Sequence, residues 1–111
     1  MKYRWTNHAK SKMKYYNLSE SRIRRVIKSP LRTEEGIAPD TIAIMQPPSY
    51  KGSGTSKTWK QEIWVMYAIK KIKDGKECVV ISAWRYPGKT KPREPLPQEI
   101  LNEIQEATHV F

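Results

Sequence analysis

Residues 61–86 read QEIWVMYAIKKIKDGKECVVISAWRY, and this stretch decides the fold. Two runs rich in β-branched and aromatic residues, 61–69 and 77–86, flank Asp74-Gly75, a dipeptide typical of tight hairpin turns. Apolar residues occupy both faces of this hairpin, so we expect it in the centre of a sheet, covered in part on both sides. A turn at Asp74-Gly75 predicts three cross-strand pairs: Trp64 with Arg85, Val65 with Trp84, and Tyr67 with Ser82.

The residues before the hairpin predict a strand followed by two helices. Basic and aromatic side chains alternate over residues 2–5, which is the period of a short strand. Thr6 is suited to cap a helix that runs to about residue 16, where Asn17 stops it, and Ser19 to cap a second that ends before Pro30. The expected buried positions are Ala9, Met13 and Tyr16 in the first helix, and Ile23, Val26 and Ile27 in the second.

The remaining segments complete an α+β pattern. We expect an edge strand or turn over 31–37, a short strand over 41–45 and an exposed loop over 47–58. A basic, proline-rich segment over 88–97 then leads into a helix over 98–108, opened by Pro97. The predicted fold is one domain over residues 1–111, with a core over about 2–87. Its two N-terminal helices pack on an antiparallel sheet of four or five strands, followed by a C-terminal helix.

The charge of the chain points to a polyanionic partner. There are 21 Lys plus Arg against 11 Asp plus Glu in 111 residues, a net charge of +10. Binding of such a surface to phosphates releases condensed counterions and is favourable. RNA is favoured over DNA, because Trp and Tyr beside Arg suit unpaired bases and no helix-turn-helix or zinc-finger pattern is present.

Several classes of protein do not fit the composition. No apolar run approaches the roughly 20 residues that span a bilayer, and the N-terminus lacks the apolar stretch of a secretory signal. The single cysteine, Cys78, excludes an internal disulfide. We therefore expect a cytoplasmic protein that does not bind membranes.

Short motifs along the chain resemble a known family. They are His8-Ala9-Lys10-Ser11-Lys12-Met13, Asn17-Leu18-Ser19, Ile27-Lys28-Ser29-Pro30, and a late strand that reads VVISAWRY over 79–86. Together they resemble small bacterial domains related to the BrnT and RelE toxins, over residues 3–87. The resemblance implies a RelE-like or barnase-like α+β fold, metal-independent cleavage of RNA on the sheet, and the ribosome or an acidic antitoxin protein as partner. Lys12 stands where the family usually has Arg, and the segments 47–60 and beyond residue 87 look like additions.

His8 is the first candidate catalytic residue. It lies in the first turn of the predicted helix, where the helix dipole disfavours imidazolium, and a neutral imidazole can accept a proton from a ribose 2′-hydroxyl. Lys12 follows one turn later on the same face. The structural alternative is a capping or partly buried histidine that bonds to a nearby backbone group.

The second candidate is Arg85, between Trp84 and Tyr86. A guanidinium fork matches a phosphate and stabilises the charge that builds up during cleavage, Trp84 would stack on a base, and Tyr86 would supply a proton. Neighbouring strand residues point to opposite faces, so Arg85 and Tyr86 share a site only if the strand ends there. The structural alternative is a core Trp84 and a solvated Arg85.

Further cations are candidates for binding alone. Arg22, Arg24, Arg25 and Lys28 share the second helix and form either a solvated face or a contact for RNA or an acidic protein. Lys60 is a further RNA-binding candidate. The glycine- and serine-rich loop before it lacks the ending of a nucleotide-binding loop.

Other chemistries have little support in the sequence. His8, Cys78 and His109 have the wrong spacing for zinc, and we expect no metal or cofactor. No serine nucleophile elbow is present, and carboxylates are too scarce in mid-chain for glycosidase or two-metal chemistry. Two hypotheses remain. A toxin-like ribonuclease predicts that His8, Lys12 and Arg85 converge in one pocket, whereas a binding module predicts dispersed cations.

Overall fold

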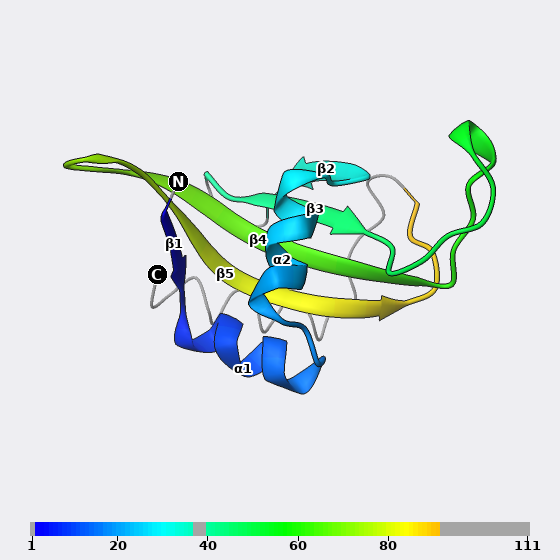
Figure 1. Cartoon of the computed structure of the whole chain (residues 1–111), viewed down its shortest axis with the longest axis horizontal. Helices are drawn as coiled ribbons and strands as arrows, with labels where there is room; N and C mark the ends of the chain where they lie inside the picture. Colours follow the sequence, from blue (N-terminus) through cyan, green and yellow to red (C-terminus); the bar gives the residue numbers. More distant parts are fainter. Residues whose placement is uncertain (1, 37–39, 92–111) are drawn as a thin grey trace.

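The computed structural model describes residues 2–36 and 40–91. Its helices are α1 (Asn7–Tyr15) and α2 (Glu20–Lys28), and a 3-10 turn covers Gly54–Ser56. Its strands are β1 (Lys2–Trp5), β2 (Arg32–Glu35), β3 (Ile42–Gln46), β4 (Gln61–Ile72) and β5 (Gly75–Pro87) (Figure 1). The predicted C-terminal helix over 98–108 lies outside the described residues.

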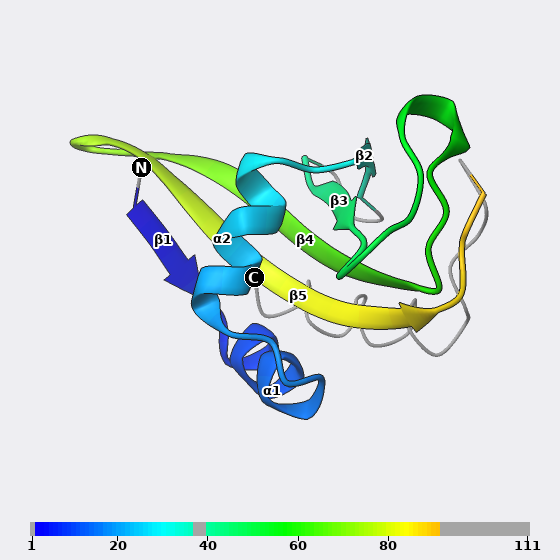
Figure 2. The ribbon, with the colours of Figure 1, turned by 45° about the vertical axis from the view of Figure 1, so that its right-hand side comes forward.

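The five strands form one sheet in the order β1-β5-β4-β3-β2. The fold class is α+β, as predicted, but the sheet is mixed, because β1 pairs with β5 in parallel and only the other pairs are antiparallel. Beyond the end of β1 the chain continues into α1 (Figure 2). The Thr6 amide donates to Val80 O at 3.2 Å and its hydroxyl to Ile81 O at 3.1 Å, so the first helix starts where β1 stops.

The hairpin forms as expected, but its predicted register is wrong. Lys73 and Asp74 make the turn, and Gly75 opens β5 at φ 132°, a conformation that favours glycine. A bulge between Met66 and Tyr67 then shifts the pairing by one residue, with Ile81 as the extra residue of β5. The observed pairs are Trp64 with Trp84, Val65 with Ala83, Met66 with Ser82, and Tyr67 with Val80.

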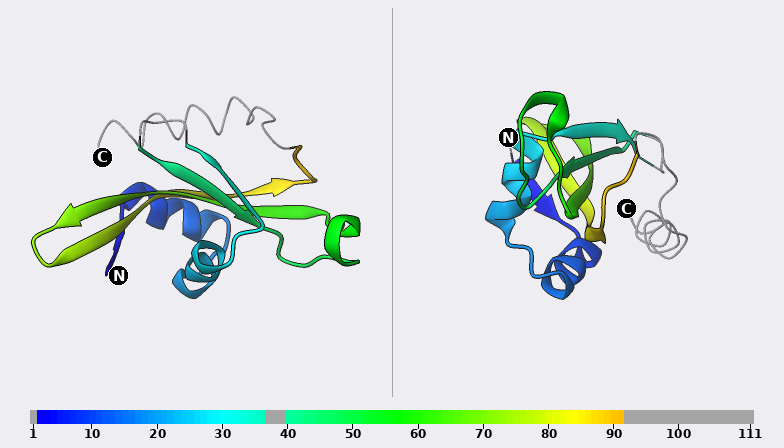
Figure 3. Two further views of the ribbon diagram at one scale, coloured as in Figure 1. Left: turned by 90° about the horizontal axis from the view of Figure 1, so that it is seen from above. Right: turned by 90° about the vertical axis from the view of Figure 1, so that its right-hand side faces the viewer.

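The helix caps form where the sequence places them. The Thr6 hydroxyl accepts from the Ala9 amide, and the Ser19 hydroxyl accepts from the Arg22 amide, each at 3.0 Å. Between the helices Asn17 adopts φ 56°, a left-handed conformation that asparagine tolerates better than most residues. This residue reverses the chain so that both helices pack on one face of the sheet (Figure 3).

Apolar side chains are buried on both faces of the sheet, as the hairpin sequence predicts. On the helix face the buried cluster contains Ala9, Met13, Leu18, Ile23, Val26, Ile44, Ile63, Val65, Cys78, Val80 and Ala83. On the opposite face it contains Ala43, Met45, Trp64, Met66, Ala68, Val79, Ile81 and Trp84. Within residues 2–36 and 40–91, neither helix has the length and apolar character to cross a membrane.

The far end of the β4–β5 hairpin extends beyond its neighbours (Figure 1). Pairing of β4 with β3 begins at Tyr67, and pairing of β5 with β1 begins at Glu77. Residues 70–76 are therefore a two-stranded ribbon with no adjacent strand among those described, which we call the hairpin arm.

Candidate nucleic-acid interface

Three arginines meet where α2 approaches the end of β5. Arg22 and Arg25 lie on α2, and Arg85 lies near the end of β5. The pKa of Arg22 is lowered from its ordinary value, first by partial burial of the guanidinium and then by the positive charges of Arg25 and Arg85. Arg22 is thus within electrostatic reach of both Arg25 and Arg85, and we call these three residues the arginine cluster.

Arg85 is held in place by the C-terminal end of α1. Its Nε donates to Tyr16 O at 2.7 Å, and its Nη2 lies 3.4 Å from Asn17 O. Its Nη1 donates to Gln61 Oε1 at 3.1 Å. A cation at this position is favoured by the negative end of the helix dipole, and three contacts fix the plane of the guanidinium.

The hydrogen-bond partners of Arg22 and Arg85 are neutral oxygens, which do not neutralise the positive charge of the arginine cluster. Arg22 Nη2 contacts Pro47 O at 3.4 Å, and the contacts of Arg85 are also to carbonyl or amide oxygens. The ion pairs found within residues 2–36 and 40–91 join other arginines to carboxylates: Arg4 to Glu77, Arg24 to Glu20, and Arg32 to Glu34 and Glu62. A group of charges that no such pair neutralises is suited to bind an anion.

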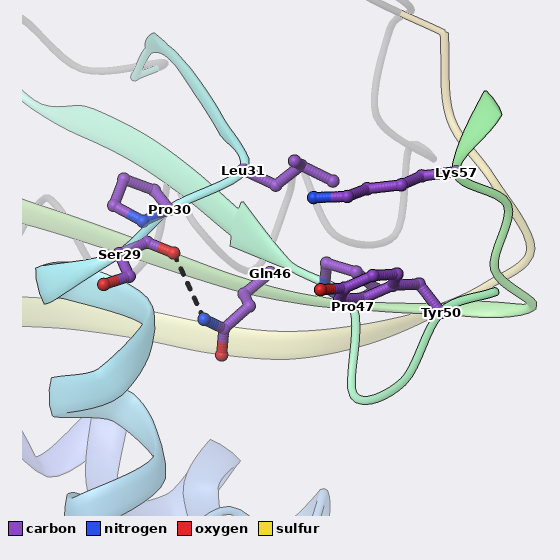
Figure 4. A pocket seen from close by; sticks show the side chains of 7 residues that line it. All are labelled: Ser29, Pro30, Leu31, Gln46, Pro47, Tyr50 and Lys57. Carbon is purple, nitrogen blue, oxygen red and sulfur yellow. Dashed lines mark hydrogen bonds between the residues drawn. The ribbon is translucent and has the colours of Figure 1, made fainter. Parts of the chain in front are cut away.

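A pocket of about 260 Å³ has Pro47 in its lining (Figure 4), and the carbonyl oxygen of Pro47 contacts Arg22. Tyr50 is 54% exposed, and Lys57 Nζ lies 4.6 Å from the centre of its ring. Gln46 Nε2 donates to Ser29 O at 3.1 Å across the floor. The lining residues are Ser29, Pro30, Leu31, Gln46, Pro47, Tyr50 and Lys57. An exposed ring and a lysine next to a cationic cluster are features that bind a base and its phosphate.

His8 lies at the opposite end of α1 from Arg85, whereas Lys12 lies in the last turn of this helix. His8 is in the first turn of α1 and is half-buried, whereas Arg85 contacts carbonyls just beyond the last turn. Eight residues of helix separate these ends by about 12 Å at 1.5 Å per residue. Lys12 Nζ lies 5.6 Å from the centre of the Tyr15 ring. The convergence of His8 with Arg85, which the ribonuclease hypothesis predicts, is therefore not seen.

The two aromatic neighbours of Arg85 are on the other face of the sheet. Trp84 is 2% exposed and stacks on Trp64 at 6.1 Å, so it is not available to stack on a base, and the core interpretation of this residue is correct. Tyr86 is half-buried and packs on the same cluster. Because β5 continues to Pro87, Arg85 and Tyr86 point to opposite faces and do not share one site.

The other predicted RNA-binding residues have separate surroundings. Arg24 pairs with Glu20 at 3.4 Å and lies over the rings of Tyr3 and Trp5, at 5.3 and 5.8 Å from their centres. Lys28, at the end of α2, and Lys60, just before β4, are exposed. Of the cations that the sequence suggests for RNA binding or catalysis, Arg22, Arg25 and Arg85 form the arginine cluster.

A buried carboxylate on the opposite face was not predicted. Glu62 is 0% exposed, and it accepts from Trp59 Nε1 at 2.9 Å, Trp64 Nε1 at 3.0 Å and Thr90 Oγ1 at 2.6 Å. Arg32 Nη1 lies 3.9 Å away and also donates to Thr90 O at 2.8 Å. These contacts attach the residues after β5 to the sheet. The signal in the sequence that could have indicated this site is Glu62 itself, an acidic residue within an otherwise apolar strand.

The part of the chain that the structure describes does not bring together side chains that could hold a metal ion. Within residues 2–36 and 40–91, no group of three or more His, Cys, Asp or Glu side chains could hold a metal ion. Cys78 is buried, and burial raises the pKa of its thiol from 9.0 to about 11. His109 lies outside the described residues.

Comparisons with known proteins identify no relative of this chain. Family models, curated proteins and solved structures each yield no match to this chain. The resemblance to BrnT and RelE toxins therefore stays a prediction from short motifs.

Proposed function

We propose that this protein binds RNA through the arginine cluster and the adjacent Tyr50 pocket. The observation that carries this proposal is the charge of Arg22, Arg25 and Arg85, which the ion pairs among the described residues leave without a carboxylate. Arginine remains protonated at any physiological pH and binds phosphate through a planar pair of donors. Phosphates of an RNA strand would relieve the repulsion within the cluster.

The Tyr50 pocket supports an unpaired strand over a duplex. Stacking on an exposed ring requires a base whose face is free, which a duplex does not offer. The pocket is small, at about 260 Å³, and Pro47 connects its wall to Arg22. One base of the RNA would occupy the pocket, and the neighbouring phosphates would contact the arginine cluster.

Metal-independent cleavage of RNA, in the manner of a toxin, is the more specific form of this proposal. It needs a base, a phosphate clamp and the scissile bond within reach of one another. His8 lies in the first turn of α1, whereas Arg85 contacts carbonyls beyond its last turn, so the geometry favours binding over cleavage. An acidic protein such as an antitoxin would compete with RNA for the arginine cluster.

Fluorescence anisotropy with a labelled, unstructured 20-nucleotide RNA in EDTA tests the binding. The double variant Arg22→Gln/Arg25→Gln should bind more weakly, and the slope of log K against log salt should fall by about 1.4, or about 0.7 per lost phosphate contact. The control Lys10→Gln/Lys14→Gln removes the same charge from exposed positions of α1. Equal losses in both double variants, or a wild-type protein that does not bind, would overturn the proposal.

The same samples test cleavage. Gel analysis should show intact RNA after prolonged incubation with the wild-type protein. Cleavage that His8→Ala and Arg85→Ala abolish, with binding retained, would instead establish an enzyme. Circular dichroism on Arg85→Ala is needed because Arg85 also holds the end of α1.

A further inference from the structure

The hairpin arm, residues 70–76, carries a second concentration of positive charge. It contains Lys70, Lys71, Lys73 and Lys76, with Asp74 as its acidic residue. Within the arm, Lys71 pairs with Lys76 and Ile72 with Gly75, and Lys70 pairs with Glu77, the first residue of β5 that also pairs with β1. The arm therefore contributes little to the core, yet it is the most basic segment of the hairpin.

One cross-strand pair of the arm brings two lysines together and does not stabilise the fold. Lys71 and Lys76 are directly opposite each other, and both are exposed. Like charges at opposed positions of an antiparallel pair are destabilising. An anion placed between the two ammonium groups removes this repulsion.

We propose that the hairpin arm is a second phosphate-binding site for the RNA held by the arginine cluster. This inference rests on the proposed function, since both sites take the same strand. Lys76 and Arg85 are nine residues apart along β5, a separation of about 30 Å at 3.3 Å per residue. An RNA of sufficient length bridges the two sites, whereas a tetranucleotide occupies only one.

The distribution of side chains favours a phosphate backbone over a membrane. Side chains alternate between the two faces of a ribbon, so Lys70 and Lys71 point to opposite faces. Cations thus lie on both faces, and the tip consists of Lys73, Asp74 and Gly75. A hairpin that inserts into lipid needs an apolar tip, whereas a ribbon with lysines on both faces can bind the phosphates of a single strand.

Anisotropy with two RNA lengths tests this inference. With a 30-nucleotide RNA, Lys71→Gln/Lys76→Gln should lower the salt slope by about 1.4 relative to wild type. With a tetranucleotide at low salt, the same variant should bind like the wild-type protein. The control Lys10→Gln/Lys14→Gln should leave the slope for the long RNA unchanged, and the arm variant should not melt earlier than wild type.

The outcomes separate the two proposals. If Arg22→Gln/Arg25→Gln lowers the slope for the long RNA and the arm variant does not, the arm site is overturned and the arginine cluster stands. If the wild-type protein binds neither RNA, both proposals fall. Loss of binding to vesicles of anionic phosphatidylglycerol in the arm variant, with an unchanged RNA slope, would assign the arm to membranes and overturn the inference.

Discussion

At the scale of single residues, burial separates functional from structural charges. Glu62 and Arg32 are both charged, but their contacts are internal and tie the residues after β5 to the sheet. Arg22 and Arg85 are also fixed, yet by neutral oxygens that leave their charge available. The partner of an arginine, more than its exposure, decides which cations can bind RNA.

Glu62→Gln should destabilise the protein by about 3 kcal/mol, because an amide group presents a donor to the donors that now surround the carboxylate. Urea denaturation followed by tryptophan fluorescence measures this, since Trp59 and Trp64 both donate to Glu62. The matched control is Glu34→Gln, which removes another partner of Arg32 at a less buried position and should cost below about 1 kcal/mol. Similar costs for the two variants would contradict the role given to Glu62.

The thiol of Cys78 makes stability depend on alkaline pH. Burial raises its pKa to about 11 in the folded protein, from the value of 9.0 expected when unfolded. As the pH rises, the unfolded state therefore loses this proton first. The contribution of the protonated thiol to the free energy of unfolding is complete below pH 9 and disappears as the pH rises toward 11. Between these values it falls by up to about 3 kcal/mol.

Comparison of wild type with Cys78→Ala measures this effect, together with the part of the rise in the Tyr67 pKa that the Cys78 charge causes. The free energy of unfolding, measured in urea at pH 8 and pH 10.5, should fall less in the variant. Parallel decreases in the two proteins would show that the thiol does not contribute.

At the scale of elements, sequence patterns predict the ends of the helices correctly, but they do not predict the direction of β1 or the register of the hairpin. Thr6, Ser19 and Asn17 mark the helix ends correctly, because a cap or a left-handed residue acts within a few positions. The parallel direction of β1 is set by its contact with β5, more than 70 residues later, which no local pattern encodes. The bulge at Met66 and Tyr67 was missed for a similar reason, since an apolar run on both faces does not specify a register.

The candidate site was predictable in its parts but not in its assembly. The basic face of α2 and the charge of Arg85 were visible in the sequence. Their meeting depends on the contact of Arg85 with the end of α1, and the pocket depends on the path of the loop after β3. The hairpin arm was overlooked because the predicted strand ended at residue 69, so its lysines appeared to lie in a turn.

Asn17 tests the turn between the helices. Its φ of 56° is accessible to glycine without strain, whereas alanine pays a steric cost. Asn17→Ala should lower the free energy of unfolding by about 1 kcal/mol, and Asn17→Gly should be close to wild type. Urea denaturation measures both, and an equal loss in the two variants would show that the side chain of Asn17, and not its backbone, stabilises the turn.

At the scale of the whole molecule, positive charge is concentrated near the two ends of β5. The arginine cluster lies beside the end of β5, and the hairpin arm lies at the beginning of the same strand. Between them, both faces of the sheet are packed with buried side chains. The rigid sheet therefore fixes the distance between the two proposed contacts.

The most direct test of the central claim is NMR titration of the labelled wild-type protein with an unstructured RNA. We expect the largest changes at the guanidinium Nε–H of Arg22, Arg25 and Arg85 and at the backbone around Tyr50, with smaller changes along α1. Changes spread evenly over all basic residues, or confined to the surroundings of His8 and Lys12, would contradict an interface centred on the arginine cluster.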